Sequence, residues 1–329
     1  MGMRTGRWAS ALAAGLLLTA CGGGGDAAAP AGSEGPPESL VLGLVPSAEV
    51  DQLVLDGEAL GELLSAELGI PVETTVTDSY AALVVAMQTG QADIGLFGPI
   101  ALVQSIDQAG AVPILQSVRR DSSSYHTQWM TNNPEKYCTT PVVQAANPEG
   151  NQFNYCNGTD TAEAGPVGVD AIGNIAEGDT VMFVDESSAS GYYYPATQIQ
   201  TVTGIDPLTG IDAQFAGGHP NSVLAVARGD VEVGVSFDDA RNEVLEEDPE
   251  IGSKVTVFAW SEEIPNDGVS VRGELSEETR TAIADAMTAV IATPEGAEAF
   301  DAVYSIEGLV PADLEQLDVA RQVAANFGG

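Results

Sequence analysis

The sequence predicts an α/β protein made of two similar lobes, and two observations lead to this prediction. From residue 40 onward, short apolar runs alternate with segments of helical periodicity, which is typical of an α/β fold with largely parallel sheets. The segment Ala86–Gly95 is repeated in order and residue type by Ala225–Gly234, and each copy reads as a helix that stops at a glycine and enters a buried strand. The repeat alone leaves a single lobe open, because any helix joined to a strand through a glycine has this pattern.

The first part of the chain contains the clearest elements. The helix expected at residues 50–68 carries leucines on one stripe and stops at Gly69, and either Asp78 or Ser79 caps the next helix. We expect strands at 40–45, 71–76, 94–97 and 112–118, and helices at 50–68, 80–89 and 100–108.

A second set of elements follows a long irregular stretch. We expect strands at 180–184, 231–235, 254–260 and 269–271, and helices at 191–202, 222–228, 277–291 and 294–303.

The N-terminus reads as an export segment rather than as part of the fold. Residues 1–20 combine two arginines with a short apolar run, which predicts a signal peptide too short to span a bilayer. The ending Leu18–Cys21 resembles a bacterial lipobox, in which Cys21 is acylated; ordinary cleavage after Ala20 is the alternative. Residues 21–39 are rich in Gly, Ala and Pro and are expected to form a flexible tether. The predicted location is therefore outside the cell membrane, with the chain anchored by lipid.

Composition excludes some functions. With 48 acidic and 11 basic residues the net charge is −37, so nucleic acid is an improbable partner. Of the three cysteines, Cys138 and Cys156 remain after Cys21, and an even pair in an exported protein predicts a disulfide rather than a metal site. We expect neither a metal nor a cofactor.

Four polar loops could hold a ligand where strands end and helices begin. The segment Asp185–Gly191 joins a strand to a helix, and its small hydroxyl residues suit a tetrahedral anion or, alternatively, a plain serine N-cap. His219 follows two glycines at a helix start and could donate to an oxyanion or simply lie at the surface. The hydroxyls of Tyr80 and Tyr125 could reach a cleft, although tyrosines in such positions mostly pack.

Asp239 and Asp267 together are the remaining candidate of the four. A carboxylate can accept a hydrogen bond from a protonated oxyanion or pair with a ligand ammonium, and it repels a fully deprotonated anion such as sulfate. In so acidic a chain, each aspartate could equally be solvated.

Together these segments resemble the phosphate/phosphite/phosphonate substrate-binding family of ABC transporters, from Leu42 to about Arg272. The resemblance is carried by the order and spacing of Asp78–Ala82, Gly90–Pro99, Ser188–Gly191, Gly218–His219, Gly229–Gly234, Asp238–Asp239 and Ile264–Asp267.

The resemblance implies the type II periplasmic-binding-protein fold, with two lobes and a hinged ligand cleft. One lobe would comprise residues 40–121 plus 241–329, and the other residues 122–240 with an inserted disulfide loop at about 136–165. The implied ligand-binding residues are Tyr80, Tyr125, Ser188, Ala189, Ser190, His219, Asp239 and Asp267. Ala189 departs from the family, which usually has a threonine there, and the insertion is longer than the family needs.

The resemblance also implies a function without catalysis. The protein would be a monomer that captures a phosphonate, phosphite or phosphate and hands it to a membrane permease. A carrier of another small solute, such as a sulfonate or an organic anion, is the alternative. An exported enzyme on the same scaffold is less favoured, because no Gly-x-Ser-x-Gly elbow or metal-ligand spacing is present.

Overall fold

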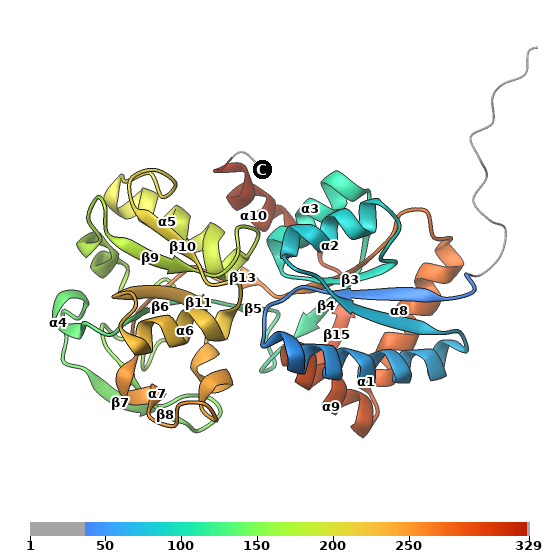
Figure 1. Ribbon diagram of the computed structural model, residues 1–329, viewed down its shortest axis with the longest axis horizontal. Helices are drawn as coiled ribbons and strands as arrows, with labels where there is room; N and C mark the ends of the chain where they lie inside the picture. The colour runs from blue at the N-terminus through green and yellow to red at the C-terminus, as the bar shows by residue number, and fades with distance from the viewer. Residues whose placement is uncertain (1–36, 328–329) are drawn as a thin grey trace, which may run out of the picture. The chain divides into compact units, whose positions relative to one another are not determined.

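Two mixed β-sheets, each covered by helices on both faces, form the described part of the chain (Figure 1). The computed structural model describes residues 37–327. The expected signal segment, Cys21 and nearly all of the expected tether lie outside the described residues, so those predictions stay predictions.

The six-stranded sheet takes its strands from both ends of the described chain. Its strand order is β15-β4-β14-β3-β1-β2. The strands are β1 (Leu40–Leu44), β2 (Val72–Val76), β3 (Ile94–Phe97), β4 (Val112–Val118), β14 (Gly268–Val271) and β15 (Gly308–Pro311). The helices are α1 (Val50–Leu68), α2 (Tyr80–Gln88), α3 (Pro99–Ala109), α8 (Glu277–Ile291), α9 (Pro294–Tyr304) and α10 (Leu314–Ala325). Helices α1, α8 and α9 pack together, and α2 packs with α3.

The seven-stranded sheet has the order β10-β9-β11-β6-β12-β8-β7. Its strands are β6 (Thr127–Thr131), β7 (Val143–Ala146), β8 (Gln152–Tyr155), β9 (Thr180–Phe183), β10 (Asp212–Phe215), β11 (Val233–Phe237) and β12 (Thr256–Trp260). The helices are α4 (Pro134–Tyr137), α5 (Tyr194–Thr203), α6 (His219–Arg228) and α7 (Ile251–Lys254). Shorter helical turns are η1 (Val169–Asn174), η2 (Ala189–Tyr193) and η3 (Ala240–Val244).

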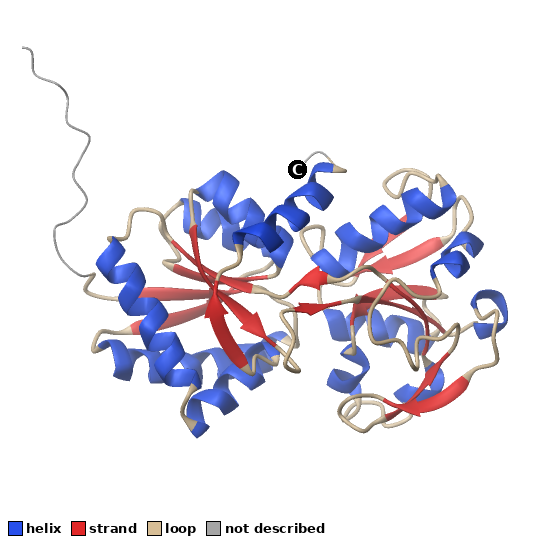
Figure 2. Ribbon diagram, turned by 180° about the vertical axis from the view of Figure 1, so that it is seen from behind, coloured by secondary structure: helices blue, strands red, loops and turns tan. Residues whose placement is uncertain are grey.

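The internal repeat corresponds to one helix-turn-strand unit in each sheet, as the sequence predicts. Helix α2 leads through a glycine into β3, and α6 leads through a glycine into β11 (Figure 1). Figure 2 shows the strands and the helices around them from behind. A Cβ built on Gly95 would lie 2.9 Å from the sulfur of Met87, and one built on Gly234 would lie 2.8 Å from Val226. Both glycines are therefore required because the preceding helix lies directly on the strand.

The sheets are mixed, so the expectation of largely parallel sheets is wrong. β1 runs parallel to β2 and β3, but β14 is antiparallel to both of its neighbours. In the other sheet, β6 is antiparallel to β11 and β12. The reason is the path of the chain, because β6 and β14 enter their sheets from the other sheet rather than through a helical crossover.

The crossings between the sheets are marked by a two-stranded pair of β5 (Ser124–Tyr125) and β13 (Ile264–Pro265). The sequence places the second crossing at residue 241. In the structure η3, α7 and β12 follow that point, and β12 pairs with β6 and β8 of the seven-stranded sheet. The second crossing therefore lies after Trp260. The sequence misplaced it because an apolar run does not reveal which of the two sheets will contain that strand.

The Cys138–Cys156 disulfide is present, with a sequence separation of 18 residues, which confirms the predicted pairing. It ties the end of α4 to the residue after β8. The expected insertion is therefore structured, since it contributes β7 and β8 to the edge of the seven-stranded sheet.

Candidate functional site

A cleft of about 570 Å³ is lined by loops from both sheets and from the crossing pair. All of the ligand residues expected from the sequence line this one cleft: Tyr80, Tyr125, Ser188, Ala189, Ser190, His219, Asp239 and Asp267. The cleft therefore brings together residues that are as much as 187 positions apart, from Tyr80 to Asp267.

The loop after β9 forms a helix start that faces the cleft. The Ser188 hydroxyl accepts a hydrogen bond from the Gly191 amide at 3.0 Å and caps η2, so the N-cap interpretation is correct for this serine. The amides of Ala189 and Ser190 have no acceptor among the described residues. Two N–H groups at a helix start are the donors that an oxyanion needs.

Ser190 and Tyr125 lie close to each other in the cleft. Ser190 is 1% exposed, and its carbonyl accepts a hydrogen bond from Thr127 that fixes the turn. Burial and the charge of Asp267 raise the pKa of Tyr125, while the neighbouring Ser190 hydroxyl and Arg119 oppose that rise. Both hydroxyls remain protonated and can donate to a ligand.

His219 begins α6 and is held in a neutral state. Its amide donates to the carbonyl of Ser47 at 3.0 Å. The helix starts at His219 and not at Ser222, where the sequence predicts its start. Its Nδ1 lies 2.8 Å from the Ser236 hydroxyl. Burial and the charge of Arg119 lower the pKa of His219 to about 3, so the ring enters the cleft as a neutral imidazole.

Tyr80 begins α2 and joins the two sheets. The helix is capped by Ser79, and the Tyr80 amide donates to a carboxylate oxygen of Asp185 at 3.4 Å. The side chain is 3% exposed. Burial first, and then Tyr304 and Asp185, raise the pKa of the phenol well above its usual value, so it acts as a donor.

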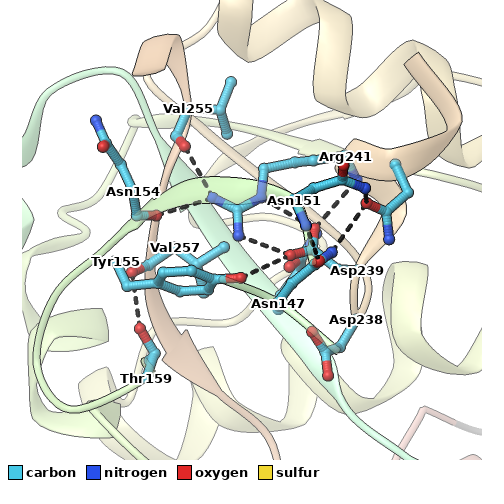
Figure 3. Close-up of polar contacts among 12 residues, drawn as sticks. Asn147, Asn151, Asn154, Tyr155, Thr159, Asp238, Asp239, Arg241, Val255 and Val257 are labelled. Carbon is cyan, nitrogen blue, oxygen red and sulfur yellow. Dashed lines mark hydrogen bonds and ion pairs between the residues drawn. The ribbon is translucent and has the colours of Figure 1, made fainter. Parts of the chain in front are cut away.

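Asp239 is fully committed to an internal ion pair (Figure 3). Arg241 reaches its two oxygens at 2.9 and 2.7 Å through Nε and Nη2. Further donors are the Arg241 amide at 3.1 Å, Gln128 at 3.2 Å and the Tyr155 hydroxyl at 3.1 Å. Both side chains of the pair are 0% exposed. The carboxylate of Asp239 thus positions the cleft wall and has no capacity left for a ligand ammonium, unlike the sequence expectation.

The adjacent Asp238 is the acid that approaches the cleft. Figure 3 shows its carboxylate turned away from Arg241. Arg120 donates to its carbonyl and places Nη1 3.9 Å from its carboxylate. Burial and the neighbouring charge of Asp239 raise the pKa of Asp238. The sequence prediction assigned the ligand contact to Asp239, because the sequence does not reveal which of the two consecutive aspartates is committed to an internal ion pair.

Asp267 is also paired, through a residue that sequence reasoning missed. Arg119 Nη2 lies 2.5 Å from a carboxylate oxygen of Asp267, and the two side chains are 16% and 18% exposed. Burial opposes the charge on Arg119, yet Asp267 raises the pKa of the guanidinium and holds it charged. The only available signal was the Arg119–Arg120 dipeptide at the end of an expected strand.

Other cleft residues carry weak signals in the sequence. His126 stacks on Trp260 with ring centroids 5.2 Å apart, and Tyr304 donates to the carbonyl of Val45 at 2.7 Å. The insertion also reaches the cleft, through Glu149 and Glu163.

Residues 37–327 lack two further features. No group of three or more His, Cys, Asp and Glu side chains could hold a metal ion. No helix in this range is long and apolar enough to cross a bilayer.

Comparison with known proteins identifies relatives of this chain. The family described as ABC transporter, phosphonate, periplasmic substrate-binding protein matches residues 42–317. The phosphate-import protein PhnD of Mycolicibacterium smegmatis is 28% identical over 68% of this chain and 62% of its own length. The phosphonates-binding periplasmic protein of Escherichia coli is 22% identical over 81% of this chain and 70% of its own length. The chain thus spans less than two thirds of the first relative.

Solved structures show the same fold. A binding protein component of an ABC phosphonate transporter from Pseudomonas aeruginosa matches with a TM-score of 0.71 and 20% identity, over 88% of this chain and 86% of that chain. PhnD1 from Prochlorococcus marinus in complex with methylphosphonate matches with a TM-score of 0.69 and 16% identity, over 88% and 98%. These likenesses confirm the type II periplasmic-binding-protein fold that the sequence resemblance implies.

Proposed function

This chain belongs to the periplasmic substrate-binding proteins of phosphonate ABC transporters, and we propose that it captures a phosphonate, phosphite or phosphate and delivers it to a membrane permease. The related proteins from M. smegmatis and E. coli are named for phosphate import and for phosphonate binding, which supports phosphate and phosphonates as ligands.

The observation that carries the proposal is the helix start at Ala189 and Ser190. Two amides without acceptors in the part of the chain that the structure describes, together with the Ser190 hydroxyl, line the same cleft as the cationic side chain of Arg119. Such an arrangement binds a tetrahedral oxyanion through charge-assisted hydrogen bonds. The absent hydroxyl at Ala189 does not remove its amide, which remains a donor.

No catalytic step is part of the proposal. Ser236 and His219 form a close serine–histidine pair, but Ser236 does not line the cleft. The hydroxyl therefore orients the imidazole instead of attacking a substrate. Tyr80, Tyr125 and His219 are expected to donate further hydrogen bonds to the ligand.

We further propose that the sheets are the cores of two lobes that close on the ligand. The proposal includes a monomer anchored at the outer face of the membrane by a lipid on Cys21. Mass spectrometry of the membrane-extracted chain would detect acylation of that cysteine, and an unmodified thiol would reject the anchor.

A thermal-shift screen tests the function. A ligand at one hundred times its Kd stabilises the native state by about 2.7 kcal/mol, which corresponds to roughly 5 °C for a protein of this size. We expect such a shift with at least one of phosphate, phosphite and methylphosphonate and a smaller one with sulfate. If sulfonates or organic anions alone shift the transition, the alternative class of solute is correct.

A further inference from the structure

The ion pair of Arg119 and Asp267 occupies one side of the cleft, and the strands around it fix its position. Arg119 follows the end of β4, and Asp267 directly precedes β14, which pairs with β4. The Asp267 carbonyl accepts a hydrogen bond from the Ser117 amide at 2.9 Å. The two side chains are therefore held against each other by neighbouring strands.

The pairing changes what the carboxylate can bind. A carboxylate that faces a cleft alone would attract the ammonium group of an aminoalkylphosphonate. Here Arg119 already supplies the cationic partner at 2.5 Å, and a second cation beside it would meet like-charge repulsion. Of the guanidinium's five N–H donors, only an Nη2 donor has an acceptor among the described residues, and the buried Nε has none.

The next residue repeats the arrangement at a second aspartate. The Arg120 guanidinium contacts Asp238 through its carbonyl and its carboxylate, and the Arg120 amide donates to Glu307 at 2.8 Å. The chain has only 11 basic residues against 48 acidic ones, yet two consecutive arginines lie beside two of the aspartates that line the cleft, Asp267 and Asp238. Five other acids that line the cleft have no ion-pair partner within the described range: Glu163, Glu243, Glu263, Asp301 and Glu307.

We propose that Arg119 is a specificity-determining residue: by pairing with Asp267 it takes the place of a ligand ammonium, so the cleft selects phosphate, phosphite and simple alkylphosphonates over aminoalkylphosphonates. The inference rests on the proposed function, because it requires the phosphorus oxyanion to bind at Ala189 and Ser190. Burial and the charge of Asp267 act on Arg119 in opposite directions, and the net rise of its pKa keeps the guanidinium charged over the physiological range.

Titration calorimetry with two matched ligands tests this inference. Propylphosphonate and 2-aminoethylphosphonate have nearly the same shape, but a methyl group in the first replaces the ammonium of the second. We expect the wild-type protein to bind propylphosphonate more tightly. In Arg119→Met, which removes the charge and keeps the length, we expect the affinity ratio to shift toward the amino ligand at least tenfold, while phosphate binding weakens.

Further variants assign the effect to the ion pair. In the double variant Arg119→Met/Asp267→Asn the gain for the amino ligand is expected to disappear. Arg321→Met is the matched control, because Arg321 lies on α10 outside the cleft and pairs with Asp107 and Asp318. The control should leave the ratio unchanged.

The outcomes separate the two proposals. If phosphorus ligands bind but Arg119→Met leaves the ratio unchanged, or if the gain persists in the double variant, the inference is wrong and the function stands. If the wild-type protein itself prefers the amino ligand tenfold, the inference is wrong. This measurement needs no variant, so it decides the question even if Arg119→Met does not fold. If none of the phosphorus ligands binds the wild-type protein, the proposed function falls, and the inference falls with it.

Discussion

Replacing Asp239 by asparagine should show that the carboxylate of Asp239, and not that of its neighbour Asp238, stabilises the fold. The substitution keeps the shape of the side chain and removes its charge. Arg241 would then carry an uncompensated charge in a position where its side chain is 0% exposed. The carbonyls of Asn154 and Val255 would still accept from its Nη1 at 2.8 and 3.0 Å.

The magnitude follows from what remains around the guanidinium. Removing one partner of a buried pair costs about 3–5 kcal/mol. The two remaining carbonyls and the rings of Phe153 and Tyr155, whose centroids lie 4.4 and 4.5 Å from the guanidinium carbon, place the expected loss at the lower end, about 3 kcal/mol. Asp238→Asn is the matched control, because burial beside Asp239 already disfavours its charged form. We expect Asp238→Asn to leave stability unchanged or to raise it.

Urea unfolding followed by tryptophan fluorescence measures both variants. Trp129 and Trp260 lie on β6 and β12 of the seven-stranded sheet and report on its unfolding. A loss below about 1 kcal/mol for Asp239→Asn would contradict the argument. An equal loss for Asp238→Asn would contradict it as well, since the two acids would then share one role.

The pH dependence has opposite signs for the two acids. Burial opposes the charge on Asp239, but Arg241 outweighs it and lowers the pKa below the usual 3.8. Its stabilisation is therefore complete above about pH 4 and is lost as the pH falls through the lower, native pKa. The pKa of Asp238 is raised in the native state, so the native state loses stability as the pH rises from the unfolded-state pKa of 3.8 toward the raised native pKa. The advantage of Asp238→Asn should accordingly grow toward neutral pH.

Four further predictions concern the ligand and the frame of the cleft. Ser190→Ala should weaken oxyanion binding by about 1.5–3 kcal/mol in calorimetry without changing the melting temperature of the free protein. Ser188→Ala should in addition lower stability by about 1 kcal/mol, because it removes an N-cap; equal effects of the two changes would refute the assignment. Replacing Cys138 and Cys156 by serine should cost about 3 kcal/mol in urea unfolding, and no loss would show that the loop needs no closure. A tight ligand should reduce the radius of gyration in small-angle scattering, whereas unchanged scattering would reject closure of the lobes.

Local sequence rules predicted the elements with clear periodicity. Helix α1 has the bounds that its leucine stripe and terminal glycine indicate, and α8 also has its expected bounds. The strand β6 was missed although all of its residues are buried, because Thr127, Gln128 and Thr131 obscure the apolar pattern. The hydroxyls of Thr127 and Thr131 donate to the carbonyls of Ser190 and Glu232, partners elsewhere in the chain that no local rule reveals.

The candidate site was predictable in its positions but not in its pairings. Helix starts at Tyr80, Ser188 and His219 can be read from caps, glycines and prolines, and all of them line the cleft. The partner of Asp267 is 148 residues away in the sequence and is set by the pairing of β4 with β14. The partner of Asp239 is two residues away, yet its significance depends on burial, which composition does not show.

The pairing of Asp267 changes the basis for rejecting sulfate. A free carboxylate would repel a dianion through its charge, but with Arg119 the site is close to neutral. Only Oδ2 of Asp267 is hydrogen-bonded within the described residues, and Oδ1 lies on the side of Gly98, at the start of α3. That oxygen can accept a hydrogen bond from the P–OH of a protonated phosphorus oxyanion, and sulfate has no proton to offer. Discrimination at this position therefore depends on one hydrogen bond to a charged group, about 1.5–3 kcal/mol, and amounts to roughly tenfold to a hundredfold rather than to exclusion.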